Sequence, residues 1–359
     1  MWHPRPAAGW CRALTPAPLY FSVGLARAVG SVLVLFLAGT APLTAATNTN
    51  SAPTASIPAA IELEYERLLE LDNAALEEVD RWIREEEAQW EQGAAVSDVT
   101  LRARIQERFR PVRIAYDEFL RKHPNHARAY LAYASFLLEI GDEDTGVQHM
   151  EKSRELDPSN PAAWNNLANH FGHRGPVKKA FEYYAKAIEL DPKEPVYYQN
   201  LATTVFLFRR DAEEYYKLDE PAVFEKSLGL YREAMRLDPT NFLLASDYAN
   251  SFYGMRPLGS ADPVYREQET HKLAERAIAG WDAVLRLAAD DLQREGTMIH
   301  LARNKFLAGR YGAARADLAA VTNAVYLDIK DKILRNIAAK EAGENATTNR
   351  PPGSPNSTP

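Results

Sequence analysis

Amide and imidazole side chains are concentrated in the stretch WNNLANHFGHRG, residues 164–175, which holds three asparagines and two histidines. An asparagine amide offers two donors and one acceptor, so it can pair with either the N–H or the C=O of a peptide backbone. Two histidines three residues apart on a helix would share one face, as a pair of metal ligands must. The stretch could therefore bind a peptide, form half of a metal site, or be an ordinary helix.

The metal interpretation lacks ligands. His170 and His173 have no suitable third ligand nearby in the sequence, and zinc sites need three or four. Residues 142–144, Asp-Glu-Asp, resemble part of a calcium loop, but the third acidic position and the closing glutamate are missing. Acids are also favourable at the start of a helix. We expect no metal and no cofactor.

Catalytic motifs are equally scarce. The single cysteine, Cys11, precedes the expected folded region, which excludes a disulfide, a thiolate nucleophile or a cysteine-ligated metal there. The sequence contains no G-x-S-x-G, H-E-x-x-H, phosphate loop or G-x-G-x-x-G. We expect a protein that is not an enzyme.

A short phrase, Leu-Asp-Pro, occurs three times and sets the organisation of the chain. It stands at 156–158, 190–192 and 237–239, and the prolines at 124, 158 and 192 are separated by identical steps of 34 residues. The next step is 47 residues. A fixed period in this range indicates a repeat architecture.

The same period aligns small residues, which lets two antiparallel helices approach closely. The expected first helices carry Ala134, Ala168, Ala202, Ala249 and Ala302, and the expected second helices carry Gly146, Ala180, Ser227, Ala277 and Ala314. Each Asp-Pro should end a second helix, because proline disfavours helical geometry in the residue before it. Gly141, Gly175 and Gly309 should end or turn first helices.

Residues 127–328 resemble tetratricopeptide repeats, whose pattern is W-x₂-L-G-x₂-Y…A-x₃-F…P. The match is nearly complete in residues 161–194, with Trp164, Leu167, Ala168, Phe171, Ala180, Tyr184 and Pro192. The resemblance implies an all-α fold, an α-solenoid of antiparallel helix pairs wound into a right-handed superhelix. The expected repeats are 127–160, 161–194, 195–241, 242–294 and 295–328.

The segments around the array have their own patterns. Residues 59–126 should form an N-terminal helical cap or degenerate repeat, because apolar residues recur there at spacings of three and four. Residues 329–342 should form a closing helix. The polar segments 47–58 and 343–359 have a composition typical of disorder.

Two insertions, 209–227 and 254–272, fall between paired helices. They combine tyrosine, arginine and proline, which are common at recognition surfaces. Tolerated growth of a turn explains them equally well, since loops lengthen at small cost. Both interpretations stay open.

In proteins of this family the first helices line a concave surface, and here their groove-facing positions are rich in amides and hydroxyls. The candidate binding residues are Asn165, Asn166, Asn169, Gln199, Asn200, Thr203 and Asn250. Members that capture a C-terminal carboxylate use cations where this chain has Leu131, Val196 and Leu243, which argues against that mode. We expect a non-enzymatic scaffold or adaptor that binds a protein or an extended peptide. The alternatives are a module for a small ligand or glycan, or an accessory subunit of an envelope enzyme.

The N-terminal region, residues 1–46, indicates export. It has arginines but no acid, then an uncharged apolar stretch and small residues, as in a secretory signal with cleavage after Ala45 or Ala46. An uncleaved membrane anchor is the alternative, because the apolar stretch approaches the ~20 residues that span a bilayer. Either places the rest in the periplasm or cell envelope. That remainder has 39 Lys+Arg and 49 Asp+Glu, a charge of −10, which disfavours nucleic acid as a partner.

Overall fold

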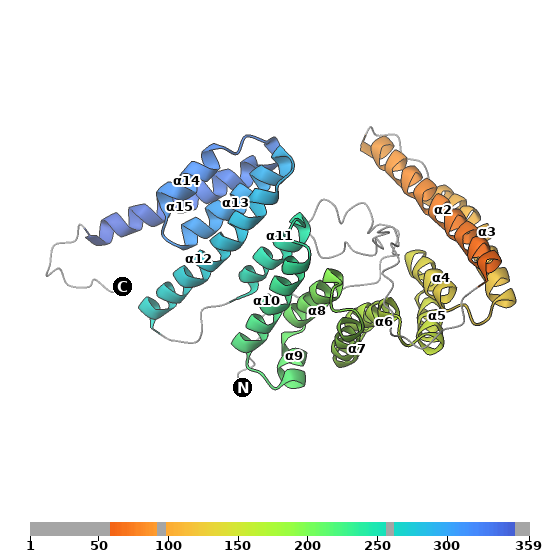
Figure 1. Cartoon of the computed structure of the whole chain (residues 1–359). Helices are drawn as coiled ribbons and strands as arrows, with labels where there is room; N and C mark the ends of the chain where they lie inside the picture. The colour runs from red at the N-terminus through yellow and green to blue at the C-terminus, as the bar shows by residue number, and fades with distance from the viewer. Residues whose placement is uncertain (1–57, 92–97, 256–261, 349–359) are drawn as a thin grey trace, which may run out of the picture. The chain divides into compact units, whose positions relative to one another are not determined.

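A computed structural model describes residues 58–91, 98–255 and 262–348. Within these ranges the regular elements are helices and no strand occurs, so the all-α fold class is confirmed (Figure 1). The chain divides between Ser159 and Asn160 into two compact units. The expected signal or anchor, residues 1–46, lies outside the described residues, and so do 47–57 and 349–359.

The first unit begins with two long helices, α2 (Ala59–Glu91) and α3 (Asp98–Lys122), that pack against each other. Their apolar faces are those that the spacing of three and four predicts, and Val112 and Tyr116 are fully buried between them. The shorter pair α4 (Ala127–Glu139) and α5 (Glu143–Leu156) follows. A Cβ atom at Gly146 would lie 3.2 Å from the backbone oxygen of Ala134, so these helices do cross at their smallest residues.

The second unit repeats this antiparallel arrangement (Figure 1). The pairs are α6 with α7, α8 with α10, α11 with α12, and α13 with α14. Their bounds are α6 (Pro161–Arg174), α7 (Val177–Leu190), α8 (Pro195–Leu207), α10 (Glu220–Leu237), α11 (Phe242–Ser251), α12 (Pro263–Leu287), α13 (Asp291–Leu307) and α14 (Tyr311–Ala319). A short 3₁₀ turn, η2 (Phe252–Gly254), extends α11, and another, η3 (Ala324–Tyr326), precedes α15 (Leu327–Thr348).

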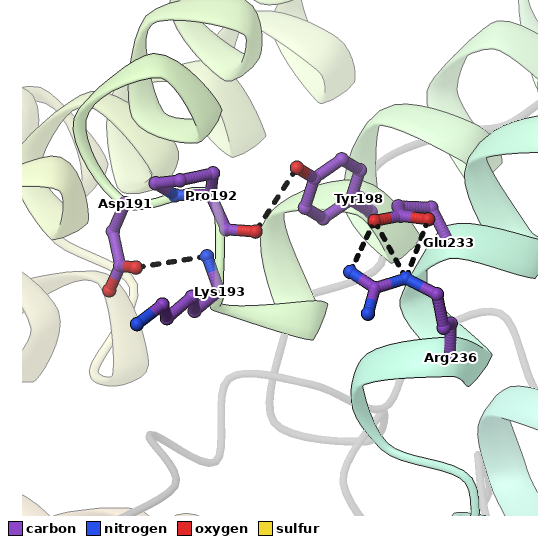
Figure 2. Close-up of polar contacts among 6 residues, drawn as sticks. All are labelled: Asp191, Pro192, Lys193, Tyr198, Glu233 and Arg236. Atoms are coloured by element: carbon purple, nitrogen blue, oxygen red, sulfur yellow. Dashed lines mark hydrogen bonds and ion pairs between the residues drawn. The ribbon is translucent and has the colours of Figure 1, made fainter.

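The Leu-Asp-Pro phrases end second helices, as predicted. Helices α5, α7 and α10 stop at the leucine, and the aspartate side chain then accepts a hydrogen bond from a residue that follows the proline. Figure 2 shows the second instance, in which Asp191 Oδ1 accepts from the backbone N–H of Lys193 at 3.1 Å. The Tyr198 hydroxyl of the next helix donates to the Pro192 carbonyl at 3.2 Å. These aspartates therefore shape turns.

Glycine ends three first helices in a backbone geometry that other residues rarely adopt. Gly141, Gly175 and Gly309 have φ of 84°, 78° and 72°. This positive φ strains any residue with a Cβ atom, which explains the glycines that the sequence places at these three ends.

The insertions lie between paired helices, but they are largely helical rather than extended turns. Residues 209–227 form a separate helix, α9 (Arg209–Tyr216), and the first turns of α10. The rings of Tyr215 and Tyr216 pack on Phe181 of α7, at centroid distances of 5.3 and 5.4 Å. In the second insertion residues 263–272 are the first turns of α12, while 256–261 lie outside the described residues. The first insertion therefore enlarges the core of the preceding repeat.

The C-terminal boundary also differs from the prediction. Helix α15 begins at Leu327 and continues to Thr348, so the closing helix is longer than 329–342. Residues 343–348, expected to be disordered, are helical. Asparagine and threonine are poor helix formers by themselves, but here they extend a helix whose Ile333 and Ile337 are already buried against α13 and α14.

Candidate functional site

The candidate amides of α6 and α8 are hydrogen-bonded to one another. Asn165 is only 6% exposed, and its Oδ1 accepts from Asn200 Nδ2 at 3.0 Å. Its own Nδ2 donates to Asn166 Oδ1 at 3.3 Å. A buried amide needs such partners, because an unpaired polar group in the interior costs about 1–3 kcal/mol. Asn165 thus connects two consecutive first helices.

Gln199 makes the corresponding connection from α8 to α11. It is 6% exposed, and its Nε2 donates to Asp247 Oδ2 at 2.9 Å. Burial raises the pKa of the Asp247 carboxyl, and the bond from Gln199 opposes that shift. The buried amides therefore join α6, α8 and α11, the first helices of three successive repeats.

Asn169 and Thr203 have partners on the second helices of their own repeats. The Tyr184 hydroxyl donates to Asn169 Oδ1 at 2.6 Å, and the Tyr231 hydroxyl lies 2.8 Å from Thr203 Oγ1. Burial raises the pKa of both tyrosines, so both phenols are neutral. These contacts join the two helices of each pair.

Four of the seven predicted residues keep amide groups available for a partner. Asn166, Asn169, Asn200 and Asn250 are half-buried, and each retains a donor or an acceptor that no other described residue uses. Asn165 and Gln199 are buried, and the Thr203 hydroxyl is used internally. Asn250 is not hydrogen-bonded to the other six among the described residues.

A second polar cluster lies at the junction of η2, α12 and α13, and sequence reasoning missed it as a unit. The Tyr253 hydroxyl lies 2.9 Å from His300 Nδ1 and accepts from Asn304 Nδ2 at 3.0 Å. The ring of His300 stacks on that of Trp281, with 4.0 Å between the ring centroids and 2° between the ring planes. Asn304 also donates to the His300 carbonyl at 2.8 Å. The signal that could have found it is that His300 stands at the same position of its repeat as Asn166 and Asn200 do in theirs.

The protonation of this cluster follows from its contacts. Burial, and then the charge of Arg303, lower the pKa of His300 to about 4, so its imidazole is neutral at pH 7. Burial raises the pKa of Tyr253, which keeps the phenol protonated. Since Asn304 donates to the phenol oxygen, the phenol hydrogen is directed to His300 Nδ1. The Tyr253 ring is therefore held in one orientation.

Beside Tyr253 is a pocket of about 160 Å³. Its wall is mainly apolar, and Arg303 lies at it with its guanidinium 4.7 Å from the centroid of the Tyr253 ring. The pocket is lined on η2 by Phe252 and Tyr253, on α12 by Leu273 and Ala274, and on α13 by Asn304 and Leu307.

The remaining chemical candidates take ordinary places in helices. Among the described residues, no group of three or more His, Cys, Asp or Glu side chains is arranged to hold a metal. His173 is exposed on α6, while the ring of His170 contacts Phe171 at 5.5 Å. Glu143 and Asp144 occupy the first turn of α5. None of the helices in the described ranges is long and apolar enough to span a membrane.

The helix pair α6–α7 is the part of the chain that matches a known family. Residues 161–194, which contain this pair, match the family model described as "Tetratricopeptide repeat". Residues 161–194 are therefore a tetratricopeptide repeat. Its neighbouring helix pairs keep the same antiparallel arrangement and the same helix-ending Asp-Pro. Proteins with these repeats are, as a class, scaffolds for protein–protein interaction.

Several solved structures are similar to this chain in fold. PilW, a type IV pilus biogenesis factor, is 11% identical, with a TM-score of 0.45, and the match covers 73% of this chain and 98% of PilW. PilF of Pseudomonas aeruginosa is 12% identical, with a TM-score of 0.45 and coverage of 72% and 99%. YrrB, described as having an unusual peptide-binding site, is 14% identical, with a TM-score of 0.43 and coverage of 63% and 98%. No curated protein matches the chain in sequence.

Proposed function

We propose that this protein is a non-enzymatic scaffold that binds a protein or an extended peptide along the first helices of its repeats. The observation that supports this proposal is the row of half-buried amides, Asn166, Asn169, Asn200 and Asn250. Three of them are held by internal hydrogen bonds that leave other amide groups unused. Oriented amides suit a polypeptide backbone, which presents both donors and acceptors.

We further propose that the scaffold works outside the cytoplasm, in the periplasm or cell envelope. The support is the basic and then apolar N-terminal sequence, with small residues before Ala45 and Ala46. Fractionation of cells that produce the full chain, with N-terminal sequencing of the mature protein, tests this. A cytoplasmic protein with an intact N-terminus would overturn it.

The binding proposal is tested best with Asn166 and Asn250. Replacing Asn169 or Asn200 removes the partner of buried Tyr184 or Asn165, so lost binding there could reflect damage to the fold. The Asn250 side chain makes no hydrogen bond to another described residue, and the Asn166 side chain makes only the 3.3 Å bond from Asn165. The double variant Asn166→Ala, Asn250→Ala is therefore the cleaner choice.

The experiment compares proteins cross-linked to this variant and to the natural chain in intact cells. Two lost neutral hydrogen bonds of about 0.5–1.5 kcal/mol each should weaken a specific complex about 5- to 150-fold. The control is Asn125→Ala, Gln148→Ala, which removes two exposed amides of the first unit. Equal capture by all three proteins would exclude the amide row as the binding surface. The identity of the captured protein separates an adaptor from an accessory subunit of an envelope enzyme.

A further inference from the structure

From the pocket beside Tyr253 we infer a specific feature of the partner: an apolar side chain, with a carboxylate on the next residue, binds between η2, α12 and α13. This inference rests on the proposed function in that the ligand is a polypeptide. It concerns different residues from the amide row, so each can fail without the other.

The size of the pocket selects a single side chain. A cavity of about 150 Å³ lined by apolar residues holds a molecule the size of benzene, and this pocket measures about 160 Å³. Sites for drug-sized ligands are typically about 300–1,000 Å³. A leucine, methionine or phenylalanine side chain fits, whereas a glycan or cofactor does not.

The wall of the pocket is rigid. Tyr253 is held through its hydroxyl by His300 and Asn304. The His300 ring is itself stacked on Trp281. Asn304 is only 3% exposed. A wall that is already ordered loses little conformational entropy when a ligand side chain enters, and this preorganisation favours binding.

The charge at the pocket selects an acidic neighbour. Arg303 is exposed, and its guanidinium has no carboxylate partner among the described residues. The next cations along the chain are paired, Lys305 with Asp317 at 2.7 Å and Arg310 with Glu275 at 3.2 Å. An unpaired guanidinium supported on a tyrosine ring is a donor for a carboxylate. The neutral His300 adds no charge of its own.

The test uses the full chain labelled with ¹³C at alanine methyl groups, because Ala274 and Ala277 line the pocket. Three blocked dipeptides serve as probes: acetyl-Leu-Glu-amide, acetyl-Leu-Gln-amide and acetyl-Ala-Glu-amide. We expect acetyl-Leu-Glu-amide to shift the Ala274 and Ala277 signals saturably, and to leave those of Ala168 and Ala180 unchanged. The uncharged Leu-Gln probe should bind about 2- to 5-fold more weakly, the usual effect of an exposed ion pair. The Ala-Glu probe should not saturate.

Two variants test separately the contact of Arg303 with the carboxylate and the entry of the apolar side chain into the pocket. Arg303→Gln should make the Leu-Glu and Leu-Gln probes bind equally, whereas the control Arg286→Gln, at the far end of α12, should preserve the difference. Thr270→Leu places a larger side chain at the pocket and should abolish the shifts, with unchanged remote alanine signals showing that the fold is intact. The inference is overturned if acetyl-Leu-Glu-amide shifts neither methyl. It is also overturned if the Thr270 variant binds as well as the natural chain, or if charge makes no difference.

Discussion

Asn200 Nδ2 donates to Asn165 Oδ1 across 3.0 Å, although the two residues are 35 positions apart in the sequence. The bond joins equivalent surfaces of consecutive repeats, and its acceptor is almost fully buried. Residues that were expected only to face a ligand therefore also hold the first helices together.

Removing the acceptor should lower stability. Asn165→Ala leaves the Asn200 amide without this partner and should reduce the free energy of unfolding by about 1–3 kcal/mol. Asn250→Ala, at a half-buried position without such a bond, should change it by about 0.5 kcal/mol or less. Urea unfolding followed by circular dichroism measures both. Equal effects would mean that the Asn165–Asn200 bond contributes nothing specific.

Asp72 should make the first unit less stable as the pH rises. One oxygen of its carboxyl accepts from the Tyr116 hydroxyl at 2.5 Å, while the other is buried with no hydrogen-bond partner in the described part of the chain. Burial raises the pKa of Asp72 to about 6 from 3.8. The native state therefore binds the proton more tightly than the unfolded state. The stability that this provides is fully present below pH 4 and is lost as the pH rises through 6.

Asp72→Asn should remove that pH dependence and stabilise the first unit at pH 7.5. Hydrogen exchange of α2 and α3 between pH 4 and 7.5, corrected for intrinsic rates, gives the comparison. An unchanged pH profile in the variant would show that another group is responsible.

His300 should have the opposite effect in the second unit. Its pKa is lowered to about 4 from 6.5, so the native state binds the proton less tightly. Stability from this group is complete above pH 6.5 and declines as the pH falls toward 4, where protonation also removes the acceptor for Tyr253. His300→Gln cannot titrate, and exchange of α13 in that variant should lose this decline. A decline of the same size would contradict the prediction.

The packing of α9 makes the first insertion a structural element. Tyr216→Ala removes the contact with Phe181 and should raise the rate of tryptic cleavage at Arg210 and Lys217 at least tenfold, corresponding to about 1.4 kcal/mol. Tyr265→Ala, an exposed tyrosine of the second insertion, is the matched control and should leave that rate unchanged. If the natural chain is already cleaved at the variant's rate, α9 is not held by this contact.

Positions that depend on local chemistry could be predicted from the sequence. Proline and glycine constrain the backbone by themselves, so the ends of α6 and α7 and the positive φ of Gly175 follow from residue type. The close crossing at Gly146 follows from the aligned small residues.

Pairing between side chains could not be predicted in the same way. Asn165 and Asn166 are adjacent and chemically identical, yet only Asn165 is buried and bonded to the next repeat. The rotation of α6 about its own axis decides which of the two is buried, and neighbouring residues of the same type give no sign of it. Tyr253, His300 and Asn304 are brought together from two repeats across an insertion, and no spacing in the sequence marks their contact.

Trp281 occupies the position in its repeat that Tyr184 and Tyr231 occupy in earlier repeats, and its indole N–H is buried with no acceptor among the described residues. Each tyrosine is hydrogen-bonded to the first helix of its own repeat. Trp281 instead stacks on His300 of α13, the first helix of the next repeat. The repeats are consequently not interchangeable parts. A duplicated copy of 161–194 would bring its own internal bond and could extend the array. A copy of residues 242–287 moved elsewhere in the array would lack His300, the residue on which Trp281 stacks.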